Sequence, residues 1–475
     1  MNYFMIFFKI LKSSWVLIPV LFTKKASDIS AIEIIVGISA LLVYILIRAI
    51  LIYLNFKFKV KDNNFVLKQG ILNKTNTSIP FEKIQNINFK QNLIQQLINV
   101  TQVEIETAGA KTVEISIKAL SREKAIALKK LLLEKQQQTV SVEPSESLEE
   151  VVYKASIKDL FMVSISENHF RSMALLFAFA FSSYVQLKDF LENFEMDERL
   201  EALMEDNANT VFGDLFLMIF LFGFCLIISI IISFVVTFLR HFNLKVSLEK
   251  NTLEIDQGLI TRQNNIIKKQ KVQSLEVITN PLKQYLGISK VVIKQAVSGR
   301  IKKNKIIKIV GSRKEHLSIL KNIFFSNPNF DNRILNKPDR YFIHKMLFRS
   351  FVFLCLLNVL FWFISTSLFF LNLVLVPLFI FLIILKYNKS YYCVNEEMLI
   401  CGSGKISTST IYFEFFKLQY IKMNQTVFQK RKGVTDLVLQ TASGRITIPC
   451  IPNDKAVELY NFILYKTEIS TKQWM

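Results

Sequence analysis

The stretch GLITRQNNIIKKQKVQ, residues 258–273, is one of three related copies in this chain of 475 residues. The other two read GILNKTNTSIPFEKIQ at residues 70–85 and GKISTSTIYFEFFKLQ at residues 404–419. Each copy begins with a glycine after a hydrophobic run, and each ends in Lys-aliphatic-Gln. The same anchors at constant offsets indicate an internal repeat. The residues that define it are Gly70, Gly258, Gly404, Lys83, Lys271, Lys417, Gln85, Gln273 and Gln419.

The similarity between the copies continues past this motif. Each copy has a turn residue followed by an aliphatic residue, then an alternating apolar strand, then a turn of small residues. The first turn reads Asn99-Val100, Gly287-Ile288 and Gly433-Val434, and the second reads Ala108-Gly109, Ser298-Gly299 and Ser443-Gly444. We therefore expect one domain of about 80 residues, enough for a modest core, to occur three times.

The second copy shows what each domain contains. Short apolar runs separated by turn residues predict antiparallel strands. These runs are Phe242–Ser247, Thr252–Asp256, Leu259–Ile267, Lys271–Ile278, Val291–Ile293 and Ile306–Ile309. A capping box from Ser312 to Glu315 then predicts a helix with an apolar face. We expect a small β-barrel or sandwich closed by this C-terminal helix, with counterparts at residues 121–135 and 453–466.

Long apolar blocks precede each copy. Hydrophobic residues make up 51% of the chain, and a helix needs about 20 of them to cross a hydrocarbon core of about 30 Å. Six blocks predict a multi-pass protein with three helix pairs: residues 4–22, 29–54, 168–186, 211–239, 348–365 and 368–386. The first block contains Lys9 and Lys12, so it either spans the membrane or lies in its interface.

The charge distribution predicts the orientation in the membrane. Two predicted spans separate successive copies, so all three copies are expected on one side. Residues 187–210 carry eight acidic and two basic residues, whereas basic residues are retained in the cytoplasm. We therefore predict that the repeated domains are cytoplasmic and that the acidic segment is an extracytoplasmic loop.

These patterns predict the order of the domains. From the N-terminus we expect a membrane helix pair at residues 1–54, a first domain at 55–135, a linker at 136–167, a helix pair with the acidic loop at 168–241, a second domain at 242–325, a linker at 326–346, a helix pair at 347–386 and a third domain at 387–468.

The motifs resemble a known family. The glycine turn, the Lys-aliphatic-Gln strand, the later turns and the helix pairs look like the bacterial pleckstrin-homology-like (PH-like) domains of the YdbS-like group, in its long three-domain membrane form. The stretches Lys158–Phe161 and Lys337–Tyr341 resemble that family's linkers. The resemblance implies a protein of the bacterial inner membrane, with a shorter single-domain PH-like membrane protein as a companion. The first copy departs from the pattern by having Asn99 where the others have glycine.

The sequence lacks catalytic and metal-binding patterns. The four histidines are isolated, and the five cysteines include no Cys-x-x-Cys pair. Cys393 and Cys401 could face each other on adjacent strands, but reduced, buried thiols are the expectation for a cytoplasmic domain. The 13 glycines are scattered, and no phosphate-binding loop precedes a helix. We therefore predict a protein that is not an enzyme and that holds no cofactor or metal.

The second domain carries most of the positive charge. Residues 242–325 have a net charge of +12, against +7 for residues 55–135 and +3 for residues 387–468. Basic side chains near an anionic leaflet attract lipid headgroups, although a charge run is more often simply solvated. The candidate headgroup contacts are Arg300, Lys302, Lys303, Lys305, Lys268 and Lys269. Nucleic acid is not an expected partner, because no recognition helix or interleaved aromatic residues accompany this patch.

Two functions of different classes fit these features. The first is a membrane scaffold whose cytoplasmic domains bind a partner protein or anionic lipid headgroups. The second is a subunit of an export or envelope-maintenance transport system. Transport paths usually need ionisable residues near the bilayer centre, whereas the predicted spans carry theirs toward the helix ends. The sequence therefore favours the scaffold.

Overall fold

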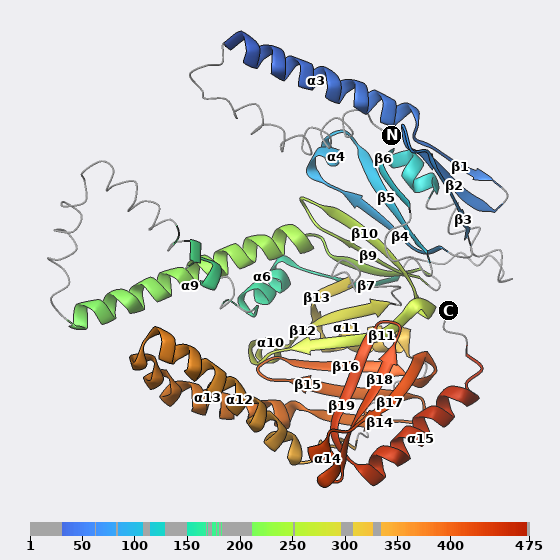
Figure 1. The fold of residues 1–475 in the computed structure, drawn as a ribbon. Helices are drawn as coiled ribbons and strands as arrows, with labels where there is room; N and C mark the ends of the chain where they lie inside the picture. Colours follow the sequence, from blue (N-terminus) through green and yellow to red (C-terminus); the bar gives the residue numbers. More distant parts are fainter. Residues whose placement is uncertain are drawn as a thin grey trace.

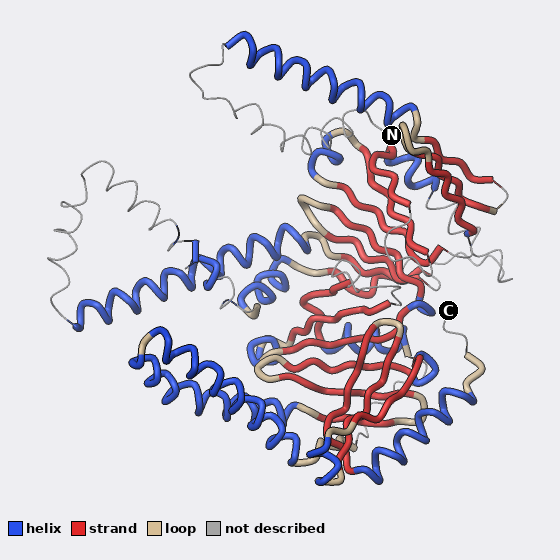
Figure 2. Tube along the Cα trace, viewed as in Figure 1, coloured by secondary structure: helices blue, strands red, loops and turns tan. Residues whose placement is uncertain are grey.

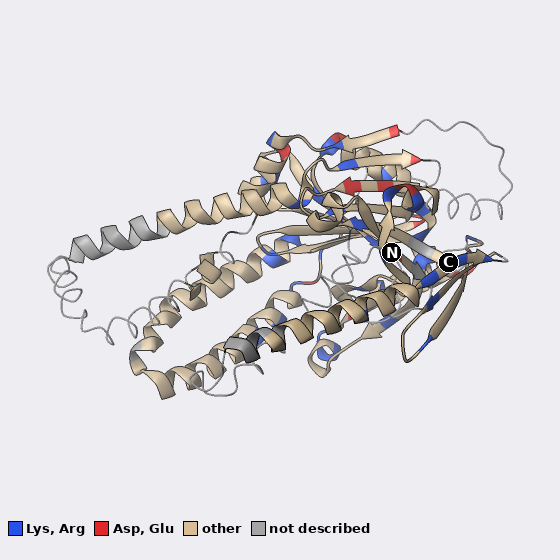
Figure 3. Cartoon of the chain, turned by 90° about the horizontal axis from the view of Figure 1, so that it is seen from above, with Lys and Arg blue, Asp and Glu red and all other residues tan. Residues whose placement is uncertain are grey.

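The computed structural model describes residues 31–61, 63–81, 84–107, 115–128, 150–167, 211–249, 252–295, 307–325 and 334–472, with a few further positions between 169 and 182. Helices that project to one side and β-domains stacked one after another make up this part of the chain (Figure 1, Figure 2). Seen from above, the described Lys, Arg, Asp and Glu residues lie mainly on the β-domains (Figure 3).

Three described helices are long and apolar enough to cross a membrane. They are α9 (Val211–His241), of which Gly223–His241 qualifies, α12 (Tyr341–Ile364), and α13 (Asn372–Lys389) together with the 3₁₀ turn η5 (Thr366–Leu371) that precedes it. Helices α12 and α13 form an antiparallel hairpin, so the chain returns to the side from which it left (Figure 1). The second and third domains therefore lie on the same side of any membrane that this hairpin crosses.

The expectation of six spans is corrected to three for the described part of the chain. Helix α3 (Ala31–Leu54) coincides with the second predicted block, but the stretch that can be assessed, Ser39–Leu54, is shorter than a span. Residues 4–22 and most of 168–186 lie outside the described residues. A continuous apolar helix of about 20 residues is the physical requirement for a span, and only three described helices meet it.

Each domain consists of two three-stranded antiparallel units joined by a corner. The first units are β1 (Lys57–Lys61), β2 (Asn64–Gln69) and β3 (Thr75–Pro80); β8 (Lys245–Glu249), β9 (Thr252–Gln257) and β10 (Arg262–Lys268); and β14 (Tyr391–Val394), β15 (Met398–Gly404) and β16 (Thr408–Glu414). The second units are β4 (Ile84–Gln91), β5 (Val100–Thr107) and β6 (Ile115–Ser121); β11 (Val272–Thr279), β12 (Ile288–Gln295) and β13 (Ile307–Arg313); and β17 (Leu418–Asn424), β18 (Val434–Thr441) and β19 (Gly444–Pro452).

Among the described strands, the two units of a domain do not close into a separate barrel, which corrects that part of the expected fold. The second unit of the first domain joins the first unit of the second domain in a seven-stranded sheet, ordered β6-β5-β4-β10-β9-β8-β7. The second and third domains share a six-stranded sheet in the same way, ordered β13-β12-β11-β16-β15-β14. The corner strands β4, β10, β11 and β16 pair with a neighbouring domain, and this pairing satisfies their edge N–H and C=O groups.

Helices complete each domain. After the fourth strand comes a short helix: α4 (Leu93–Leu97), α10 (Pro281–Tyr285) or α14 (Val427–Arg431). The expected closing helices are α11 (Lys314–Phe324) and α15 (Asn453–Ile469), with a helical segment at 122–128 in the first domain. Helix α11 begins after Arg313, so the predicted capping box at Ser312 is wrong. Ser312 is instead buried as part of β13.

The stretch 136–167, which the sequence suggested as a linker, contributes two elements. They are β7 (Glu150–Lys154), which extends the seven-stranded sheet beside β8, and α6 (Ile157–Ile165). Ser156 caps α6, because its hydroxyl accepts from the backbone N–H of Asp159 at 3.1 Å while the Asp159 carboxylate accepts from the Ser156 backbone at 3.0 Å. This capped helix then packs against α9.

The repeat glycines are explained by backbone geometry. Gly70, Gly258 and Gly404 have φ angles of 111°, 103° and 149°, in the region that favours glycine. A Cβ at Gly258 would lie 2.1 Å from the carbonyl oxygen of Thr261, and the other two glycines have the same conflict three residues ahead. The turn that ends the second strand of the first unit in each domain therefore requires glycine.

The Lys-aliphatic-Gln motif forms the corner between the two units of a domain. In the second and third copies the lysine ends a 3₁₀ turn, η3 (Lys269–Lys271) or η6 (Phe415–Lys417). The register then shifts at the glutamine in all three copies, between Ile84 and Asn86, between Val272 and Ser274, and between Leu418 and Tyr420. The glutamine is thus the extra residue of a β-bulge, which bends the strand into the second unit.

Asn99 does not disturb the repeat. It adopts a φ of 50°, close to the 67° of Gly287 and the 65° of Gly433. Asparagine is the residue that most readily replaces glycine in the left-handed region. The same turn therefore leads into β5, β12 and β18.

Cys393 and Cys401 are buried free thiols on adjacent strands. The register pairs Cys401 with Tyr392 and Cys393 with Ile400. Because this offset of one residue puts the two thiols on opposite faces of the sheet, they belong to different hydrophobic cores and do not face each other.

Candidate functional site

The two junctions between domains are built by the same strand pairing. At the first junction β10 pairs with β4, and Asn265 lies opposite Asn88. At the second junction β16 pairs with β11, and Ile411 lies opposite Glu276. Counted from the repeat glycine of each domain, both pairs join position 7 of the later domain to position 18 of the earlier one. The junction is therefore part of the repeat, with a fixed register.

The second junction is also held by side chains. The Ser409 hydroxyl donates to the Glu276 carboxylate, which also pairs with Lys294 at 2.8 Å. Ser274 and Ser443 are hydrogen-bonded at 3.2 Å across the domain boundary. The Lys321 ammonium lies 4.4 Å from the ring centroid of Tyr412. These contacts are partly or fully buried, so they add to the strand pairing.

The core confirms that the second and third domains form one body. Cys393, Ile400 and Tyr412 of the third domain belong to the same buried cluster as Leu275 and Ile293 of the second. Burial of apolar surface contributes about 25 cal/mol per Å², so separating these domains would expose part of a shared core.

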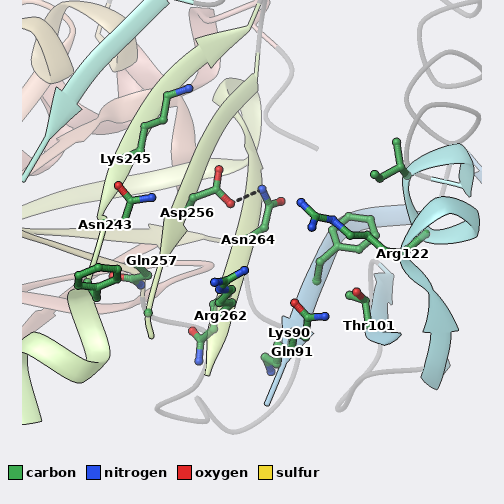
Figure 4. A pocket seen from close by; sticks show the side chains of 16 residues that line it. Lys90, Gln91, Thr101, Arg122, Asn243, Lys245, Asp256, Gln257, Arg262 and Asn264 are labelled. Atoms are coloured by element: carbon green, nitrogen blue, oxygen red, sulfur yellow. Dashed lines mark hydrogen bonds between the residues drawn. The ribbon is translucent and has the colours of Figure 1, made fainter. Parts of the chain in front are cut away.

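A cavity of about 500 Å³ lies at the first junction, beside the paired strands β4 and β10 (Figure 4). Its wall comes from both domains and carries more than one basic side chain. The polar lining residues are Lys90, Gln91, Thr101, Arg122, Asn243, Lys245, Asp256, Gln257, Arg262, Gln263 and Asn264. Two independent domains without this strand pairing would not form it.

The charges in this cavity are only partly neutralised. Lys90 pairs with Glu104 at 2.6 Å, and the Asn264 amide donates to Asp256 at 2.6 Å. Arg122, from the first domain, and Arg262, from the second, are exposed and pair with no carboxylate among the residues that the structure describes. Two guanidinium groups in one cavity favour an anion, which they can hold by paired hydrogen bonds.

The cavity lies at the membrane-proximal end of the sheet. Phe242 and Asn243 in its wall directly follow α9. The Gly258 turn is tied to the same helix end, because the Gly258 N–H donates to the Phe242 carbonyl and the Leu259 N–H to the Leu239 carbonyl, both at 2.9 Å. An anionic group at the membrane surface would therefore be within reach of this site.

Arg300, Lys302, Lys303 and Lys305 lie outside the described residues. The strands that flank them can be followed, however: β12 starts at Ile288, beside α10, and runs to Gln295. Eight residues at about 3.3 Å each put Gln295 roughly 23 Å from Ile288. Because Asn280, just before α10, donates to the Ser166 carbonyl on the side of α9, strand β12 ends on the opposite, membrane-distal side of the sheet.

Lys268 and Lys269 lie at this same distal end. The η3 turn leads into Val272, which pairs with Gln295 at the base of the hairpin. Burial, and then the charge of Lys271, lower the pKa of Lys268 from its ordinary value. The grouping of these lysines with the hairpin, and contact of the group with headgroups, stay predictions.

Sequence reasoning missed the cavity at the first junction. Arg122 and Arg262 come from different domains and are not among the residues that define the repeat, and only the pairing of β4 with β10 brings them together. In the described part of the chain, no cluster of His, Cys, Asp or Glu could hold a metal ion. Burial raises the pKa of the Cys450 thiol to about 11, so this thiol stays protonated at neutral pH.

Comparison with known proteins agrees with the repeat. The family model described as "Bacterial PH domain" matches residues 15–136, 209–323 and 351–467. Each match contains one copy of the repeat and an apolar helix before it. The chain is also similar to the UPF0699 transmembrane protein YdbT of Bacillus subtilis (strain 168), with 23% identity over 397 residues, or 79% of this chain and 77% of that protein.

Proposed function

This chain belongs to the bacterial PH domain family, and we propose that it is a non-enzymatic membrane scaffold whose PH-like domains bind a partner protein or anionic lipid headgroups. The edge-to-edge pairing of the domains is the observation that carries the proposal. Independent binding modules need only flexible linkers. Two shared sheets, together with the core that the second and third domains share, instead hold three domains in one geometry, as a scaffold requires.

The cavity at the first junction is the proposed headgroup site. Arg122 and Arg262 pair with no carboxylate among the described residues, and they line the same cavity as Phe242 and Asn243, which follow α9. Each basic side chain near an anionic membrane surface contributes about 1 kcal/mol. Together the two arginines would strengthen phosphate binding by more than about tenfold.

This site is tested on the full-length protein in micelles. Binding of phosphatidylglycerol, measured by native mass spectrometry, should fall at least about tenfold in Arg122→Gln with Arg262→Gln. A second variant replaces Arg300, Lys302, Lys303 and Lys305 with Gln and tests the hairpin in the same assay. A loss in the hairpin variant alone would return the headgroup site to the hairpin. Phosphatidylcholine is the control lipid, and added salt should weaken the interaction.

We also propose that the helices span the inner membrane of a bacterium and that the PH-like domains lie on its cytoplasmic side. The acidic segment 187–210 against basic domains supports this orientation. Cysteines introduced as Glu198→Cys and Lys303→Cys should label from opposite sides of intact cells, with Glu198→Cys labelled from outside. Labelling of both from one side would contradict it.

The partner protein remains a proposal that the family resemblance suggests. A shorter membrane protein with one PH-like domain is the candidate, because such a domain carries the same two kinds of sheet edge. No feature in the described part of the chain favours the export alternative.

A further inference from the structure

Strands β3 and β17 lack the neighbour that their counterparts in the other domains have. Strand β3 pairs only with β2, and β17 pairs only with β18, among the residues that the structure describes. The first sheet of the chain and the last lie at opposite ends of the stack of domains (Figure 1). One chain therefore cannot join its own β3 to its own β17.

These two edges are the two halves of the junction that the chain already uses twice. Strand β17 is the counterpart of β4 and β11, and β3 is the counterpart of β10 and β16. An open β17-type edge and an open β3-type edge are thus complementary. Exposed edge strands readily pair with another chain.

We propose that β17 of one chain pairs with β3 of a second copy, which continues the series of junctions from chain to chain. The inference deepens the proposed scaffold function and rests on it. It assigns the partner of the two outer edges. A head-to-tail contact of this kind builds a ring or an open filament, depending on whether the rotation closes.

The internal junctions fix the register of the new one. Position 18 of the earlier domain is Lys422 in the third domain, and position 7 of the later domain is Thr77 in the first. Lys422 should therefore lie opposite Thr77, and Ile421 opposite Ser78. Strand β3 reads TNTSIP and carries no charge, so nothing on it repels Lys422.

The membrane anchors are compatible with this arrangement. Each internal junction joins domains whose apolar helices project to the same side (Figure 1, Figure 3). The same junction applied once more places the helices of the next copy on that side too. All copies would then lie in one membrane.

The test uses two full-length chains with different affinity tags, expressed together. One carries Lys422→Cys and the other Thr77→Cys, and membranes are treated with a mild oxidant. Antiparallel partners have Cα atoms about 4.5–5.5 Å apart, within the range for a disulfide. A cross-linked species with both tags and the mass of two chains is expected, at least about tenfold more abundant than with Ser78→Cys, whose side chain points to the other face.

A single chain carrying Glu276→Cys and Ile411→Cys is the folding control, because it reports the same register inside the molecule. If this pair cross-links while Thr77→Cys with Lys422→Cys does not, the proposal is overturned. Equal cross-linking of Ser78→Cys would also overturn it, because the register would be wrong.

The proposals of a lipid site and of a chain-to-chain contact can be refuted independently of each other. Arg122→Gln with Arg262→Gln leaves both outer edges intact, so the cross-link between tags should persist in that variant. A wild-type protein that binds phosphatidylglycerol but has the mass of one chain in micelles and in nanodiscs would refute the contact and leave the proposed function standing.

Discussion

Strands β11 and β17 occupy the same place in the repeat but differ in their surroundings. Strand β11 lies between β12 and β16, and Ser274 on it is 1% exposed. Strand β17 pairs only with β18, and Tyr420 at the same repeat position is 54% exposed. The motif determines that a strand starts here. Whether a further domain follows in the chain determines whether its outer edge is buried.

The residues on the two strands fit this difference. At position 18 the closed edge has Glu276, which bonds to Ser409 of the next domain, whereas the open edge has Lys422. A lysine on an open edge limits unspecific pairing, because burying its charge without a partner is costly. The open edge can therefore stay soluble until a strand in the correct register covers it.

The largest expected effect comes from placing a charge at the same position of both strands. Ser274→Lys should lower the free energy of unfolding by about 3–5 kcal/mol, because the ammonium would be buried at the junction. Tyr420→Lys should change it by less than about 0.5 kcal/mol at high dilution. Thermal unfolding of the full chain in detergent measures both. Equal effects would remove the distinction between closed and open edges.

The turn glycines give the next largest effect. Gly258→Val should lower the free energy of unfolding by about 3 kcal/mol. A β-branched residue at this position would have an unfavourable φ of 103° and would collide with the Thr261 carbonyl. Gly70→Val has the same local conflict, but β3 pairs with no other domain among the described residues. Protease cleavage within the first junction should therefore rise only in Gly258→Val.

The control for these glycine variants is Gly287→Asn. Its Cβ would meet nothing within 4 Å, and Asn99 already occupies the equivalent turn. This variant should lower the free energy of unfolding by less than about 1 kcal/mol. If it proved as harmful as Gly258→Val, the steric explanation of the repeat glycine would be wrong.

The corner lysines should respond differently in the two domains. Lys417 is buried and pairs with buried Glu414 at 2.6 Å. Lys417→Met should lower the free energy of unfolding by about 3 kcal/mol, because the buried Glu414 carboxylate would lose its partner. Lys271→Met should change the free energy of unfolding by less than about 1 kcal/mol, since Lys271 makes no ion pair among the described residues. Adding Glu414→Gln to Lys417→Met should restore part of the loss in chemical denaturation.

The smallest effect concerns α6, which attaches the second domain to α9. Burial raises the pKa of the Asp159 carboxyl, but hydrogen bonds from Ser156 and the Arg313 guanidinium at 3.1 Å outweigh it, so the pKa is lowered. This contribution is present above the unfolded pKa of about 4 and is lost as the pH falls through the folded pKa. Asp159→Asn should cost about 1 kcal/mol at pH 7 and progressively less below pH 4. A difference that is constant with pH would exclude the ion pair.

Local sequence features predicted the elements well where each residue has a local reason to be there. The repeat glycines have positive φ, the Lys-aliphatic-Gln motif starts the second unit of each domain, and a helix follows the last strand. The pattern could not reveal β7, because Glu150–Lys154 is too short to stand out as a strand without β8 beside it. The mistaken cap at Ser312 has a similar cause, since pairing with Ser289 keeps that residue in β13.

The sequence by itself determined that one domain occurs three times and that apolar helices precede the copies, because glycine turns, bulges and long apolar runs depend on residues close together in the chain. The tertiary structure decided which strand edges meet, which core is shared and where two distant arginines form a cavity. Strand edges consist of backbone N–H and C=O groups that every residue carries. Their choice of partner therefore leaves little mark on composition or spacing, and it follows from how the folded domains fit against each other.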